Sequence, residues 1–130
     1  MFRLNRSLPP EVGSFRFARY HYGMAIDDQK EAEHCARYLR AVADPERLRI
    51  IQCLRGGPKH VSQLAELLDE EVVNVSHHLG VLRQAGVVQD EKQGRFVLYR
   101  LHPDVFQATK TSRAEDYLNF GCCRIEIPKR

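Results

Sequence analysis

The spacing of apolar residues in the middle of the chain predicts two short helices joined by a turn. Val75, Leu79 and Leu82 follow one another at intervals of four and three residues, so they share one buried face of a helix. Gly86 comes next and suits the left-handed position at which a helix ends. The preceding helix has inward-facing leucines of its own at Leu64, Leu67 and Leu68. Two helices in this order, separated by the acidic residues 69–71, predict a helix-turn-helix.

The residues that follow Gly86 predict a β-hairpin. Residues 87–88 open a strand, residues 89–95 form a polar tip, and residues 96–101 form a second strand rich in apolar side chains. Gly94 near the end of the polar segment supplies a turn residue. A hairpin placed directly after a helix-turn-helix is the wing of a winged-helix domain.

Three further helices are predicted around the helix-turn-helix. The first runs from about residue 28 to 43, and the second follows Asp44 as cap with Pro45 at its first position, where the missing N–H costs nothing. A last helix is predicted from Asp104 to Asn119. The predicted fold class is therefore mainly α with a small β-hairpin, a winged helix-turn-helix in the order α-α-α-α-β-β-α. The predicted domains are an N-terminal basic extension (1–26), a DNA-binding and dimerisation domain (27–121) and a C-terminal tail (122–130).

Four segments of the chain resemble the ArsR/SmtB family of winged helix-turn-helix repressors. They are Ala43-Asp44-Pro45-Glu46-Arg47-Leu48-Arg49-Ile50-Ile51, Ser76-His77-His78-Leu79, Arg83-Gln84-Ala85-Gly86-Val87-Val88 and Gly94-Arg95-Phe96-Val97-Leu98-Tyr99-Arg100-Leu101. The resemblance implies a sequence-specific DNA-binding transcriptional regulator, a dimeric repressor that an inducer releases. It also implies a homodimer formed through the first and last helices, which binds a double-stranded operator with an imperfect palindrome.

The charge of the chain is mild and unevenly placed. The net charge is +3, and the first 24 residues alone hold four arginines and one glutamate. The remainder is close to neutral, so affinity for DNA must come from a local basic patch. The N-terminal segment has no helical period and is expected to be a disordered tail, or an arm that touches DNA or a partner subunit. No apolar run reaches the roughly 18 residues of a membrane span, and no secretion signal is seen, so a cytoplasmic protein is expected.

Seven residues are candidate DNA contacts: Val73, Asn74, Ser76, His77, Arg83, Lys92 and Arg95. The resemblance places Ser76 and His77 on the exposed side of the recognition helix, where they would contact a phosphate or a base edge. Many family members have polar residues where this chain has Val72 and Val73, which leaves apolar contact with thymine methyl groups. Lys92 and Arg95 at the wing tip suit a phosphate or a narrow minor groove. The alternative for His77 and for the wing pair is a solvated surface.

The four cysteines are Cys35, Cys53, Cys122 and Cys123, and their spacing indicates reduced thiols rather than a disulfide framework. The metal-binding patterns of the family on the last helix and at residues 60–65 are incomplete here, so neither is expected to bind an ion. Cys122 and Cys123 could meet Cys35 at the dimer interface and bind As(III) or another thiophilic ion. Core packing and a redox-reactive pair are the alternatives. Cys53 is expected to be buried and inert.

Three functional classes follow: a DNA-binding repressor, a winged helix that binds another protein, and an enzyme. No paired acid and base, nucleophile elbow or phosphate loop is present, so the sequence does not indicate an enzyme. The polar face at Ser76 and His77, together with Arg95, favours DNA, because a protein-docking surface more often carries apolar residues.

Overall fold

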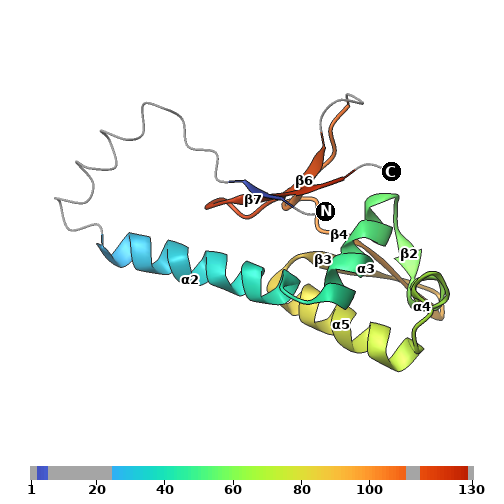
Figure 1. The fold of residues 1–130 in the computed structure, drawn as a ribbon. Helices are drawn as coiled ribbons and strands as arrows, with labels where there is room; N and C mark the ends of the chain where they lie inside the picture. Colours follow the sequence, from blue (N-terminus) through green and yellow to red (C-terminus); the bar gives the residue numbers. More distant parts are fainter. Residues whose placement is uncertain (1–2, 6–24, 111–114, 129–130) are drawn as a thin grey trace.

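The computed structural model of the protein describes residues 3–5, 25–110 and 115–128 (Figure 1). Its helices are α2 (Ala25–Val42), α3 (Pro45–Arg55), α4 (Val61–Leu68) and α5 (Val72–Ala85). Its strands are β1 (Arg3–Asn5), β2 (Lys59–His60), β3 (Val88–Gln93), β4 (Phe96–Leu101), β5 (Phe106–Gln107), β6 (Asp116–Asn119) and β7 (Arg124–Ile127). The strands form two sheets, ordered β2-β4-β3 and β1-β7-β6-β5. The helices and the first sheet confirm the predicted winged helix-turn-helix.

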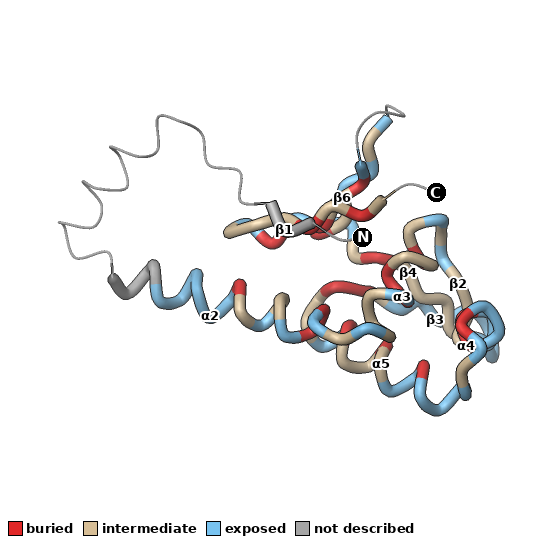
Figure 2. Tube along the Cα trace, in the orientation of Figure 1, coloured by how far each residue is buried: buried red, intermediate tan, exposed pale blue. Residues whose placement is uncertain are grey.

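Helices α3, α4 and α5 pack around one apolar core (Figure 2). Its most deeply buried side chains on these helices are Ile50, Ile51, Leu64, Leu79 and Leu82, each fully inaccessible to solvent. Val75 is also buried, which confirms the predicted stripe of α5. Burial of one such side chain stabilises the fold by about 1.5 to 3 kcal/mol, so this core determines how the two helices of the helix-turn-helix are held.

One leucine of the predicted inward face of α4 points outward. Leu67 is 60% exposed, while Leu64 and Leu68 are buried together with Ala65. At 3.6 residues per turn, the three buried residues fall on one side of the helix and Leu67 falls beyond its edge. The interpretation of Leu67 as a core residue is therefore wrong, and its exposure bears on the binding surface described below.

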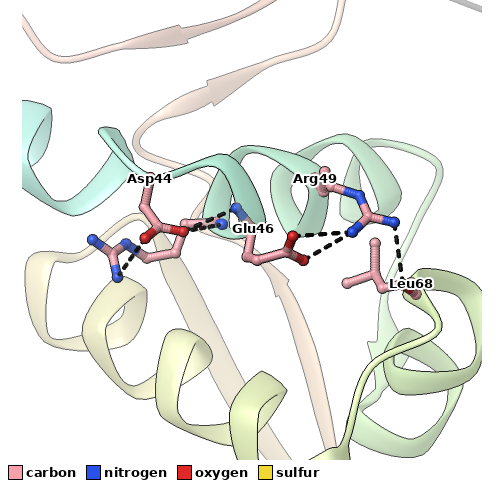
Figure 3. Close-up of polar contacts among 5 residues, drawn as sticks. Asp44, Glu46, Arg49 and Leu68 are labelled. Atoms are coloured by element: carbon pink, nitrogen blue, oxygen red, sulfur yellow. Dashed lines mark hydrogen bonds and ion pairs between the residues drawn. The ribbon is translucent and has the colours of Figure 1, made fainter.

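Asp44 caps α3 as predicted (Figure 3). Its carboxylate accepts hydrogen bonds from the backbone N–H groups of Glu46 (2.9 Å) and Arg47 (3.2 Å). Partial burial opposes ionisation, but these bonds and the charge of Arg47 outweigh it and lower the pKa of Asp44. The charged cap therefore stabilises the folded state fully at pH values above the pKa that Asp44 has in the unfolded chain. This stabilisation is lost as the pH falls through the lowered pKa of Asp44 in the folded protein.

Arg49 joins α3 to the helix-turn-helix. Its guanidinium donates to both carboxylate oxygens of Glu46, at 3.1 and 2.9 Å, and to the backbone carbonyl of Leu68 at 3.1 Å. Figure 3 shows Arg49 between these two partners. The bond to Leu68 satisfies one of the carbonyl groups left open at the end of α4, so it fixes that helix end against α3.

Helix α5 ends at Gly86, as predicted. Gly86 has φ = 84°, in the left-handed region, and the N–H of Val87 donates to the carbonyl of Leu82 at 2.9 Å. A Cβ added at Gly86 would lie 3.7 Å from the hydroxyl oxygen of Tyr38 on α2. That distance is an ordinary van der Waals contact, so the left-handed φ, and not crowding by α2, is what favours glycine at position 86.

Gly80, by contrast, lies inside α5 and has no left-handed φ that would require glycine. Apart from its chain neighbours and the nearby backbone of α5 itself, no atom lies within 4 Å of the position that its Cβ would take. Because glycine in a helix interior costs about 0.8 to 1.0 kcal/mol relative to alanine, we expect Gly80→Ala to raise the free energy of unfolding by about 1 kcal/mol. Urea denaturation followed by circular dichroism measures this. Gly94→Ala is the control and should destabilise, because φ is 62° there; a loss of stability in Gly80→Ala would contradict the prediction.

The wing is longer than the sequence indicated. Strand β3 pairs with β4 from Val88 opposite Leu101 to Gln93 opposite Phe96, so only Gly94 and Arg95 form the turn. Most of the segment predicted as a polar tip is therefore strand. Its side chains are largely exposed, which removes the apolar alternation that would have revealed it. The strand predicted at residues 96–101 is confirmed as β4.

The predicted last helix is wrong. The segment from Asp104 to Asn119 contains β5 and β6 instead, and β7 follows them. In β6, and again in β7, residues alternate between buried and more exposed, which is the period-two pattern of a strand; Ile125 and Ile127 are the buried residues of β7. Isoleucine is also β-branched and favours strands. The described residues of this segment therefore provide no helix of the kind predicted for the dimer interface.

The C-terminal sheet also changes the predicted domain boundaries. The predicted tail from residue 122 includes β7, which pairs with β6 on one side and with β1 on the other. Residues 122–128 therefore belong to the folded body. Residues 1–2 and 6–24 of the predicted N-terminal extension lie outside the described residues, and residues 25–26 are the start of α2. None of the described helices combines the length and apolar character that crossing a membrane requires.

A buried ion pair fastens this sheet to the helices. Arg55 at the end of α3 donates from Nη1 to Oδ2 of Asp116 at 3.2 Å, and the Asp116 side chain is only 8% exposed. The other oxygen of Asp116 accepts from the backbone N–H of Thr109 at 2.9 Å. Leu118 and Ile125, paired across β6 and β7, join the main apolar core. The two sheets and the helices are therefore one packed unit.

Candidate nucleic-acid interface

The outer face of α5 is uncovered, and it carries the helix residues predicted to contact DNA. Val73, Asn74, Ser76 and His77 are all exposed, on the sides of α5 away from its buried stripe (Figure 2). His78 is half-buried instead, with its ring centroid 5.7 Å from that of His77. The structure therefore leaves these four side chains accessible to a large partner.

His78 has a structural partner that its position in the motif does not reveal. Its Nδ1 lies 3.2 Å from Nη1 of Arg47, and Nε of Arg47 donates to the backbone carbonyl of Ala41 at the end of α2. The contact links α5 to the α2–α3 junction. His78 therefore positions α5, and His77 beside it is the exposed histidine.

Arg83 has a local ionic partner. Its Nη1 lies 3.1 Å from Oδ2 of Asp90 on β3, and both side chains are substantially exposed. Arg100 on β4 likewise pairs with Glu91 on β3. The Arg83–Asp90 contact joins the end of α5 to the wing, so the structure gives Arg83 a part in holding the wing as well as its predicted contact with DNA.

The wing residues predicted to contact DNA are both exposed. Lys92 lies on β3, and Arg95 occupies the turn next to Gly94. Phe96, just after the turn, is 57% exposed, and its ring centroid lies 5.5 Å from that of His60. The hairpin thus presents two cations and an aromatic ring. The sequence predicted Phe96 only as a strand residue and did not predict its exposure.

Apolar side chains gather at the same end of the domain. Among the described residues, the large hydrophobic side chains that remain exposed are Leu67, Val72, Val73 and Phe96. The first three come from the end of α4 and the start of α5, on either side of the acidic turn at residues 69–71. The exposure of Leu67 is the feature that the sequence pattern missed.

The structure also brings together three of the four cysteines. Cys35 on α2 forms a disulfide with Cys122 in the turn between β6 and β7, and Cys123 lies beside them. The expectation of reduced thiols alone is therefore wrong, and the three sulfurs meet within one chain rather than across a dimer interface. Cys53 on α3 is outside this cluster, and burial, which outweighs the nearby Lys59 and Arg49, raises the pKa of its thiol.

Comparisons with known proteins show which family this chain resembles. Residues 44–90 match the model of the bacterial regulatory protein family named arsR. The chain is 37% identical over 68 residues to the transcriptional repressor SdpR of Bacillus subtilis (strain 168), which covers 52% of this chain and 76% of SdpR. It is 46% identical over 86 residues to the HTH-type transcriptional repressor SmtB of Mycobacterium tuberculosis (strain ATCC 25618 / H37Rv), which covers 66% of this chain and 64% of SmtB.

A solved structure shares the architecture. Reduced HlyU from Vibrio cholerae N16961 superposes with a TM-score of 0.55 at 29% identity, over 58% of this chain and 80% of that one. The match to the family model ends at residue 90, before most of the wing and the C-terminal sheet. With a helix-turn-helix, a wing and a repressor relative matched over three quarters of its length, this chain belongs to the arsR family of bacterial regulatory proteins.

Proposed function

We propose that the chain is a sequence-specific transcriptional repressor that binds double-stranded DNA as a homodimer. The observation that carries the proposal is the uncovered outer face of α5, with Ser76 and His77 exposed beside a wing that carries Lys92 and Arg95. A helix of this kind fits the major groove, where side chains reach base edges. Membership in a family of regulatory proteins supports the same conclusion.

The charges around α5 favour one orientation on DNA. The acidic turn at residues 69–71 would be repelled by phosphates, whereas the wing cations Lys92 and Arg95 would be attracted. Val72 and Val73, both exposed, are suited to contact with thymine methyl groups at the start of the helix. We therefore place α5 in the major groove with the wing along the backbone.

The proposal of a homodimer rests on how much DNA one recognition helix can cover. One recognition helix covers about half of an operator, and two of them related by a two-fold axis read an imperfect palindrome with half-sites about one helical turn apart. Residues 29–34 of α2 are all exposed, and Cys35, which follows them, is buried. This part of the helix extends beyond the other helices (Figure 1). We assign the dimer contact to α2, with release from DNA by an inducer as the mode of regulation.

The exposed apolar residues favour one competing function. Leu67, Val72 and Phe96 could form a docking surface for another protein, in which case binding would depend on apolar burial. The two functions differ in their response to salt. Binding to DNA releases counterions and weakens steeply as salt rises, whereas apolar docking does not.

Salt titration of DNA affinity by fluorescence anisotropy tests the proposal. We expect log affinity to fall linearly with log salt concentration, and Arg95→Ala to reduce the slope by about 1, because one phosphate contact is lost. Lys110→Ala removes the same charge from an exposed bend after β5 and should leave the slope unchanged. A wild-type affinity that salt does not change would contradict DNA binding, and an unchanged slope in Arg95→Ala would show that the wing tip is only solvated.

A further inference from the structure

An open groove lies between α2 and α5. The C-terminal half of α2 packs against α5 (Figure 1). The groove has a volume of about 450 Å³ and is lined by Arg37, Arg40, Ala41, Val81, Gln84 and Ala85. Its three apolar residues are buried or half-buried and form the floor, while the two arginines and the glutamine are exposed. The groove therefore presents two cations and an amide above an apolar base.

The two arginines of the groove lack an anionic partner. Among the residues that the structure describes, neither Arg37 nor Arg40 makes an ion pair or a side-chain hydrogen bond. Glu33, one turn before Arg37, accepts a hydrogen bond from Gln29 at 3.4 Å instead. Because Arg37 and Arg40 are three residues apart, they are neighbours on the helix surface and repel each other. An anion bound between them would remove this repulsion.

The groove opens beside the face of α5 that we propose meets DNA. Gln84 follows His77 by seven residues, which is nearly two full turns, so both side chains lie on the same side of the helix. Both are also exposed. Val81 and Ala85 lie between this side of α5 and α2, because they line the groove together with the arginines. Arg37 and Arg40 therefore lie next to the C-terminal half of the recognition face.

The side chains of the groove suit a phosphate group. A guanidinium presents parallel N–H groups that match two oxygens of a phosphate, and glutamine amides also donate to the DNA backbone. The residues that line the groove include no carboxylate that would repel a phosphate. An extended partner fits the open shape of the groove, since its phosphates can reach the rim without entering an enclosed cavity.

We propose that Arg37, Arg40 and Gln84 form a phosphate clamp for the backbone of duplex DNA, beside the residues of α5 that read bases. The inference rests on the proposed function, because it requires α5 to lie in the major groove. The two arginines contribute affinity by neutralising phosphates and releasing counterions, and they contribute no sequence preference. They supply the local positive charge that DNA binding needs in a chain whose charge beyond residue 24 is close to neutral.

Salt titration of DNA affinity by fluorescence anisotropy tests the phosphate clamp. Arg37→Ala and Arg40→Ala should each lower the slope of log affinity against log salt concentration by about 1, and the double variant should lower it by about 2. The affinity lost should be the same for an operator duplex and for a scrambled duplex. Lys110→Ala, which removes one charge from an exposed bend after β5, is the matched control and should keep the wild-type slope.

The outcomes separate the clamp from the proposed function. If the affinity of the wild-type protein does not change with salt, the proposed function fails. If Arg95→Ala lowers the slope but Arg37→Ala/Arg40→Ala does not, the clamp alone is overturned. A loss confined to the operator duplex would also overturn the clamp, because it would mean that the arginines read bases.

Lysine variants distinguish lost charge from lost structure. Arg37→Lys/Arg40→Lys keeps both charges and should keep the wild-type slope, whereas Arg37→Gln/Arg40→Gln keeps only hydrogen-bond donors and should lower the slope as alanine does. Circular dichroism should show both variants folded, because the two side chains are exposed. A low slope in the folded lysine variant would overturn the clamp. Sedimentation of the alanine double variant as a monomer, where the wild type is a dimer, would also overturn it and assign the arginines to a partner subunit.

Discussion

Replacing Ser76 and His77 together by alanine is expected to abolish sequence-specific binding to DNA while the domain stays folded. Both side chains lie on exposed sides of α5, away from the buried Val75, Leu79 and Leu82, so the free energy of unfolding should change by less than about 0.5 kcal/mol. Each lost base or phosphate contact costs about 1 to 3 kcal/mol of binding free energy, so losing both should cost more than losing either one.

The comparison needs a variant that removes an exposed polar side chain elsewhere. Gln107→Ala does this on β5, in the far sheet, and should retain wild-type affinity. Affinity is measured by anisotropy with a labelled operator, and folding by circular dichroism. Wild-type affinity in the double variant would mean that α5 does not enter the groove with this face.

Arg55→Ala is expected to destabilise the fold by about 3 kcal/mol, the lower end of the range for breaking a buried ion pair. The substitution leaves the carboxylate of Asp116, 8% exposed, without the guanidinium that faces it at 3.2 Å. The hydrogen bond from the N–H of Thr109 remains and limits the loss. Because Arg55 is on α3 and Asp116 on β6, the loss should loosen the C-terminal sheet first.

Arg100→Ala provides the matched comparison, because Arg100 pairs with Glu91 in a largely exposed position. An exposed pair contributes about 0 to 1 kcal/mol, so this variant should unfold close to the wild-type urea midpoint. Urea denaturation of both variants gives the two free energies. Similar losses in the two would show that the Arg55–Asp116 pair does not anchor the sheet.

The part of the fold that follows from local rules could be predicted from the sequence. Asp44 and Gly86 bound helices through caps that depend on neighbouring residues alone, and Val75, Leu79 and Leu82 form a stripe that any buried helix of this period requires. The exposed polar residues of α5 followed from the same periodicity together with the family motif. These predictions needed no knowledge of distant contacts.

The segment after the wing depends on contacts between distant residues, and there the predicted helix at residues 104–119 is wrong. Ile125 and Ile127 alternate with half-buried residues as a strand requires, but this strand forms only by pairing with β6 and β1, which are distant or separate segments of the chain. Most of β3 could not be predicted as strand, because its side chains are largely exposed and show no apolar alternation. The three cysteines could be grouped by their chemistry, yet their meeting within one chain depends on how the β6–β7 turn packs on α2.

Selection of bound DNA from a random double-stranded pool tests the central claim most directly. The protein should enrich an inverted repeat whose half-sites lie about one helical turn apart, because two α5 helices related by a two-fold axis would read adjacent major grooves. The Ser76→Ala/His77→Ala variant, selected in parallel, should enrich nothing above background. Failure of the wild-type protein to enrich any sequence, or enrichment of an unpaired half-site, would contradict a dimeric, sequence-specific repressor.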